Sequence, residues 1–163
     1  MPFSRLGSLA LHIELFILCM SVVLGLLHIV LAAHSASVQR GYRWTASPRD
    51  EQLPALTGVA GRFSRALANF GETFPLFAAL VFIVHATGSY GALSKWGAWL
   101  YLVGRVAYLP LYAFGVNFVR SLAWNVATGG ILLLLVSVLA QCNALIVCIA
   151  LVETHRGEVD AQD

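Results

Sequence analysis

Charged residues are scarce in this chain of 163 residues, and their scarcity limits what kind of protein it can be. Asp, Glu, Lys and Arg make up 11% of the sequence, whereas soluble domains carry about 25%. Apolar residues make up 59%, and the mean hydropathy is +0.79. This composition excludes a disordered chain and a coiled coil. It also argues against a soluble enzyme and indicates an integral membrane protein.

Cysteine and lysine are also rare, and a strong net charge is missing. Only three cysteines occur, at Cys19, Cys142 and Cys148, all inside apolar runs and without ligand spacing. They are therefore interpreted as small core residues, and neither a disulfide-stapled module nor a metal site is expected. Lys95 is the single lysine and the net charge is +2, so the sequence gives no reason to expect a nucleic-acid partner.

Long apolar runs predict four membrane-spanning helices, since one span needs about 20 largely apolar residues. The first run follows Arg5 and could be read as a signal peptide, but its length of about 25 residues exceeds a signal core of about 7–15. We therefore expect one all-α domain over residues 1–163, folded as a bundle of four helices. The predicted spans are approximately 9–33, 65–86, 97–114 and 120–152, with a polar connection at 34–64 and a polar tail at 153–163.

The distribution of arginine predicts the orientation in the membrane. The connection 34–64 carries Arg40, Arg43, Arg49 and Arg62. Basic residues accumulate on the cytoplasmic side, so this connection is expected in the cytoplasm and both termini on the opposite side. Compact loops and a composition rich in Arg, Ala and Leu favour a bacterial inner membrane over the endoplasmic reticulum.

Polar side chains recur at helical spacing inside the second and third predicted spans. A charge deep in a bilayer costs about 2.5–3.5 kcal/mol on insertion scales, so such residues usually face the bundle interior. The offsets place each set on one helical stripe, in the cytoplasmic half of its span. The residues of this polar layer are Arg65, Asn69, Glu72, Arg105, Tyr108, Tyr112 and, at the start of the fourth span, Arg120.

Two interpretations of the polar layer compete. Glu72 and Arg105 could form an interhelical ion pair that only assembles the bundle. That pair leaves Arg65 and Arg120 without a carboxylate, and an excess of guanidinium groups beside phenols and an amide favours an anionic, peptide-like ligand.

Glu14, near the outer end of the first span, is expected to extend toward the lipid headgroups.

Three segments resemble one known family. They are RFSRALANFGETFPLF at residues 62–77, GRVAYLPLY at 104–112 and RSLAW at 120–124. Together they are similar to the membrane-associated proteins in eicosanoid and glutathione metabolism, the MAPEG family, and the similarity covers nearly the whole chain. It implies a homotrimer of four-helix bundles in membrane lipid, with active sites between subunits that take glutathione and a lipophilic small molecule.

The resemblance also implies roles for the residues of the polar layer. Glu72 would bind the α-amino group of glutathione, while Arg65 and Asn69 would hold its carboxylates or backbone. The γ-glutamyl end and the peptide groups would contact Arg105, Tyr108 and Tyr112.

Two further arginines match family residues at the reacting end of glutathione. Arg120 would hold the thiol as the thiolate, and Arg40 would assist at the mouth of the site. The expected activity is a glutathione-dependent transferase or peroxidase that acts on lipophilic electrophiles or lipid hydroperoxides.

The chain departs from the family pattern at several positions. Ala68 stands where some prostaglandin-forming members have Arg, Tyr108 stands where one subgroup has His, and Trp124 stands where several members have Tyr. These differences argue against assigning a specific eicosanoid activity. They leave a non-catalytic lipid-binding or scaffold protein of the same fold as the main alternative. A small transporter is disfavoured, because the polar residues cluster at one depth and no inverted repeat is visible.

Overall fold

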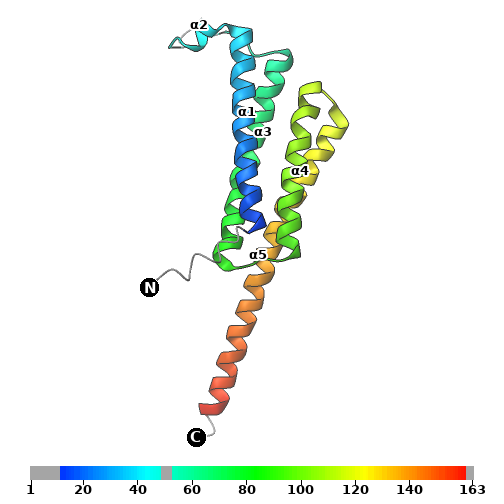
Figure 1. Cartoon of the computed structure of the whole chain (residues 1–163). Coiled ribbons are helices and arrows are strands. Elements are labelled where there is room, and N and C mark those ends of the chain that lie inside the picture. The colour runs from blue at the N-terminus through cyan, green and yellow to red at the C-terminus, as the bar shows by residue number, and fades with distance from the viewer. Residues whose placement is uncertain (1–11, 49–52, 161–163) are drawn as a thin grey trace, which may run out of the picture.

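The described residues, 12–48 and 53–160 of a computed structural model, form helices joined by short connections (Figure 1). No strand occurs among them. Four helices are long, and one helix of four residues was not predicted. The expectation of an all-α fold is confirmed. The elements are α1 (Ile13–Arg40), α2 (Tyr42–Thr45), α3 (Gly58–Thr87), α4 (Ala92–Phe114) and α5 (Asn117–Asp160).

Three of the long helices, α1, α3 and α5, contain stretches long and apolar enough to cross a membrane. The third predicted span corresponds to α4, which does not meet that criterion over the described residues. Lys95, Arg105 and several aromatic residues lower its apolar character. The all-helical chain with three membrane-capable helices has the secondary structure expected of an integral membrane protein.

The helices are longer than the predicted spans, because polar residues continue them at their ends. The C-terminal turns of α1 and the first turns of α3 occupy parts of the predicted connection 34–64, and α5 includes most of the predicted tail 153–163. Residues 9–11 and 161–163, together with Arg5 and Arg49, lie outside the described part of the chain. Both Pro75 and Pro110 lie inside continuous helices.

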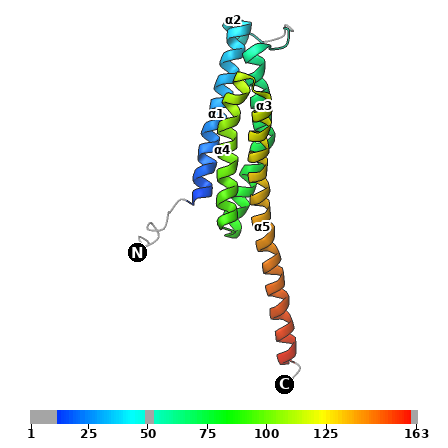
Figure 2. The same ribbon diagram turned by 90° about the vertical axis from the view of Figure 1, so that its right-hand side faces the viewer.

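The four long helices run side by side over the length of α4, and α5 continues beyond the others toward the C-terminus (Figures 1 and 2). Helix α4 makes its most extensive contact with α5. The two backbones approach closely at a pair of glycines: a Cβ on Gly130 would lie 2.5 Å from the carbonyl oxygen of Gly97. Small residues permit this close approach, as is common between membrane helices.

The connection between α4 and α5 depends on Gly115. Its φ of 76° lies in the left-handed region, which glycine adopts without steric cost. The guanidinium group of Arg62, from α3, lies so close that a Cβ on Gly115 would be 2.7 Å from its Nη1 atom. A cation at this position faces the C-terminus of α4, where the helix dipole favours positive charge. Arg62 of α3 therefore lies against the turn between α4 and α5.

Glu14 does not extend to the headgroups as predicted. Its side chain is 1% exposed, and Ser94 of α4, also buried, donates a hydrogen bond of 2.5 Å to its Oε1 atom. The prediction was wrong because α4 brings a hydroxyl group to the carboxylate, and this contact depends on how two helices pack. The hydrogen bond ties the start of α1 to the start of α4.

Candidate functional site

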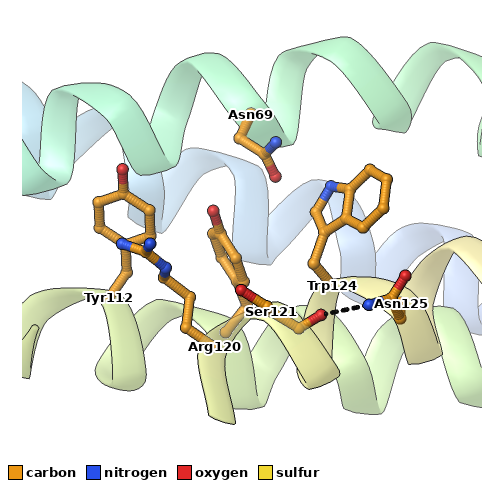
Figure 3. Close-up of a pocket in the computed structure, with 7 residues that line it drawn as sticks. Asn69, Tyr112, Arg120, Ser121, Trp124 and Asn125 are labelled. Carbon is orange, nitrogen blue, oxygen red and sulfur yellow. Dashed lines mark hydrogen bonds between the residues drawn. The ribbon is translucent and has the colours of Figure 1, made fainter. Parts of the chain in front are cut away.

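A polar cavity of about 240 Å³ lies between α3, α4 and α5 (Figure 3). Asn69 projects into it from α3, and residues of α4 and α5 form the opposite side. Four of the seven lining residues belong to the polar layer predicted from sequence. The lining residues are Asn69, Tyr108, Tyr112, Arg120, Ser121, Trp124 and Asn125.

Arg120, in the first turn of α5, lines this cavity and stacks on an aromatic ring. Its Cζ atom is 4.6 Å from the centroid of the Tyr112 ring, which is a favourable cation–π geometry. The phenol oxygen of the same tyrosine accepts a hydrogen bond of 3.2 Å from Nε of Arg65. Tyr108 lies beside Tyr112, with ring centroids 5.3 Å apart. Arg120 of α5 thus contacts the face of the Tyr112 ring, and Arg65 of α3 contacts its hydroxyl group.

Arg105 lies behind the cavity and does not line it. Its side chain is fully buried, and its Nη1 atom donates a hydrogen bond of 2.7 Å to Oδ1 of Asn69. Its Nη2 atom donates to the hydroxyl oxygen of Thr73. One lone pair of the Asn69 oxygen is therefore occupied, while its second lone pair and the NH₂ group can still contact a ligand. Arg105 therefore fixes the position of the Asn69 side chain and does not itself line the cavity.

Glu72 and Arg65 of α3 both have exposed side chains, although Arg65 also reaches the phenol group of Tyr112. Glu72 accepts a hydrogen bond of 3.5 Å from Nδ2 of Asn69. The interhelical ion pair considered above does not form, since Arg105 bonds to Asn69 and Thr73 instead. Exposed charges on a membrane-capable helix are costly unless another surface covers them.

The structure does not bring Arg40 to the cavity. This residue ends α1, and its Cζ atom is 4.7 Å from the centroid of the Trp44 ring in α2. It is not among the residues that line the cavity. Its predicted role at the mouth of the site therefore stays a prediction.

Sequence reasoning did not assign to the site three residues that line the cavity, Ser121, Trp124 and Asn125, nor Thr73, which lies behind it with Arg105. Thr73 continues the stripe of Arg65 and Asn69 at the next i+4 position, and this spacing could have identified it. Ser121 and Asn125 line the cavity on α5, where Nδ2 of Asn125 donates a hydrogen bond of 3.0 Å to the carbonyl oxygen of Ser121. Their polar character within an apolar helix was the available signal.

Trp124 lies across the cavity from Asn69, and Figure 3 shows its indole nitrogen on the side that faces the asparagine. This Nε1 atom is buried and has no hydrogen-bond partner among the described residues. An unpartnered buried donor is costly, and a ligand acceptor would satisfy it. The cavity lining contains one guanidinium group and no carboxylate. Its chemistry therefore suits a ligand rich in acceptor atoms and negative charge.

A sequence model of the MAPEG family matches residues 17–140, which is most of the chain. The matched range includes every candidate site residue described above. No curated protein matches the sequence.

Proposed function

The chain belongs to the MAPEG family, and on that premise we propose that it is a membrane-bound, glutathione-dependent transferase or peroxidase. Its second substrate is a lipophilic electrophile or a lipid hydroperoxide. The observation that carries this proposal is the polar cavity itself. Arg120, the phenols of Tyr108 and Tyr112, and the amide of Asn69 converge there from three helices.

The residues present fit the groups that glutathione carries. Its carboxylates and peptide oxygens need donors, which the NH₂ group of Asn69 and the guanidinium groups of Arg65 and Arg120 supply. Its α-amino group needs an acceptor, and Glu72, whose carboxylate accepts a hydrogen bond from Asn69, is the candidate. A single chain therefore offers complementary partners for both ends of the tripeptide.

A homotrimer is part of the proposal, because one chain leaves the cavity small and two charged side chains of α3 uncovered. The cavity of about 240 Å³ is smaller than typical ligand sites of about 300–1,000 Å³. Arg65 and Glu72 are exposed on α3, and in a membrane they need a covering surface. A neighbouring subunit would supply the missing wall and would cover these charges. Arg40 at the end of α1 is then a candidate to reach the site of a neighbour.

Arg120 is proposed to activate the glutathione thiol. A thiol with an ordinary pKa near about 8.5 is mostly protonated at neutral pH. A guanidinium group within about 4 Å, in a site partly shielded from water, lowers that pKa by about one unit or more. Stacking on Tyr112 fixes the guanidinium in place, so its position does not depend on the ligand. The thiolate supplies the nucleophilic chemistry of the reaction.

The test is an ultraviolet difference spectrum recorded while glutathione is added to the purified protein at neutral pH. We expect thiolate absorbance that saturates in the wild type and is lost in Arg120→Leu, whose glutathione affinity falls by no more than about tenfold because one of several contacts is removed. Arg43→Leu, an exposed arginine on α2, is the matched control. A wild type that binds glutathione without forming thiolate would favour the non-catalytic alternative, and equal thiolate signals in Arg120→Leu would refute the role of Arg120.

A further inference from the structure

A groove of about 530 Å³ lies on the exposed side of α4. Four exposed residues of this one helix line it: Lys95, Trp96, Trp99 and Val103. At about 3.6 residues per turn their side chains fall within an arc of about 100°, and the fully buried Tyr101 lies on the opposite side of the helix. The groove therefore faces away from the bundle.

The groove and the polar cavity lie at different levels of α4 and share no residue. The groove begins near the start of α4, at the end of the bundle where α1 begins and α3 ends (Figure 1). Tyr112, which lines the cavity, lies about 25 Å further along the helix than Lys95, at about 1.5 Å per residue. The groove is therefore a separate site.

Lys95 is the single lysine of the chain, and its ammonium group has no partner among the described residues. Two of the described side chains are carboxylates, Glu14 and Glu72. Glu14 is buried and accepts a hydrogen bond from Ser94, and Glu72 lies about 22 Å before the end of α3. The dipole of α4 does not stabilise the cation either, since the start of a helix favours negative charge. This position therefore favours an anion from outside the chain.

The polar atoms that line the groove can donate hydrogen bonds but cannot accept them. An ammonium group has three donors and no acceptor, and an indole nitrogen is a donor only. A headgroup amine would find no acceptor here, whereas the oxygens of a phosphate diester would find donors. The indole rings and Val103 make the rest of the lining apolar, and it extends about 12 Å along the helix from Lys95. This part of the groove suits a hydrocarbon chain.

We propose that the groove binds one anionic phospholipid per chain, with its phosphate on Lys95 and an acyl chain along Trp99 and Val103. Free phosphate would leave the apolar part of the groove uncovered. A second copy of the chain fits poorly, because the described side chains offer no exposed carboxylate at this end of the bundle. The site lies outside the proposed active site, so this inference does not rest on the proposed function.

A phospholipid bound at Lys95 would fix the depth of α4 in the membrane, because lipid phosphates lie at the boundary between headgroups and hydrocarbon. The hydrocarbon core is about 30 Å thick, and Tyr112 lies about 25 Å from Lys95 along α4. The bound lipid therefore keeps the polar cavity near the opposite surface of the membrane, where a water-soluble ligand can enter.

The test counts the lipids that remain bound to the detergent-solubilised, full-length protein in native mass spectrometry. Phosphatidylglycerol and phosphatidylcholine with the same acyl chains are added separately, and only the first has a net charge. We expect the wild type to retain one phosphatidylglycerol per chain and to bind it about fivefold more tightly, as one lysine near an anionic headgroup predicts. Lys95→Gln should lose this preference, and Lys95→Arg should keep it. Arg43→Gln removes an exposed cation on α2, at the other end of the bundle, and is the matched control.

A second variant tests the apolar part of the groove without changing its charge. Trp99→Ala should weaken binding of phosphatidylglycerol by about fivefold, because part of the acyl chain loses its contact with the indole ring. Glycerol phosphate, which has the anionic group but no acyl chain, should not displace the lipid. Displacement by glycerol phosphate, or unchanged binding in Trp99→Ala, would overturn the proposal.

Three outcomes of the charge variants would also overturn the phospholipid site. Equal lipid retention by the wild type and Lys95→Gln would exclude a role for the lysine. Equal losses in Lys95→Gln and Arg43→Gln would show a general effect of charge. Dissociation of the oligomer by Lys95→Gln would place a second copy of the chain in the groove.

This inference and the proposed function can fail separately. Lys95→Gln should form as much glutathione thiolate as the wild type, because Lys95 lies far from the polar cavity. Phosphatidylglycerol retention that depends on Lys95, in a protein that forms no thiolate, would keep the lipid site and refute the proposed enzyme.

Discussion

Replacing Gly130 by alanine should weaken the packing of α4 against α5. These two helices carry the tyrosines and Arg120 that line the polar cavity. A Cβ at this position would lie 2.5 Å from the carbonyl oxygen of Gly97 and 2.7 Å from the backbone nitrogen of Tyr101. Both neighbours are backbone atoms, so no side-chain rotation can relieve the contact. Overpacking of this kind costs about 1–3 kcal/mol.

The adjacent residue provides a matched control. A Cβ on Gly129 would meet nothing within 4 Å. Both substitutions lie inside α5, and each gains about 1 kcal/mol of helix propensity. That gain cancels when the two variants are compared, so Gly130→Ala should be less stable than Gly129→Ala by the overpacking cost alone.

Thermal unfolding in one detergent, followed by circular dichroism, measures the difference. For a chain of this size, about 1 kcal/mol corresponds to a Tm shift of about 2–4 °C. We therefore expect Gly130→Ala to unfold about 2–12 °C below Gly129→Ala. Equal Tm values in the two variants would refute the close approach of α4 and α5 at this level.

Two further substitutions test buried polar contacts with the same assay. Thr73→Val removes one of the two acceptors of the buried Arg105 guanidinium group and should lower the free energy of unfolding by about 1.5–3 kcal/mol, since the bond is charge-assisted. Ser94→Ala leaves both carboxylate oxygens of Glu14 without a partner and should cost about 1–3 kcal/mol. Ser137→Ala, which loses only a hydrogen bond to a carbonyl oxygen of its own helix, is the control for both. If either variant is as stable as this control, the corresponding interhelical bond does not contribute as described.

The sequence by itself determined the helical character and the composition of the polar layer. Apolar runs of spanning length require helices in a membrane, because only then are all backbone groups hydrogen-bonded within the segment. The i+3, i+4 and i+7 spacing placed Arg65, Asn69 and Glu72 on one face of α3. The same argument grouped Tyr108 with Tyr112 on α4. Of the α3 set only Asn69 meets these two phenols at the cavity, since Arg65 and Glu72 are exposed.

Only the tertiary structure decided what each polar residue does within that layer. Arg105 shares a stripe with Tyr108, yet it lies fully buried behind Asn69 because Thr73 of α3 accepts its second hydrogen bond. Glu14 is buried because α4 brings Ser94 against it. Helical periodicity fixes the face on which a side chain lies, but not the neighbour that this face meets. That choice depends on how closely two helices can approach, and here the backbone contact at Gly130 sets the approach of α4 and α5.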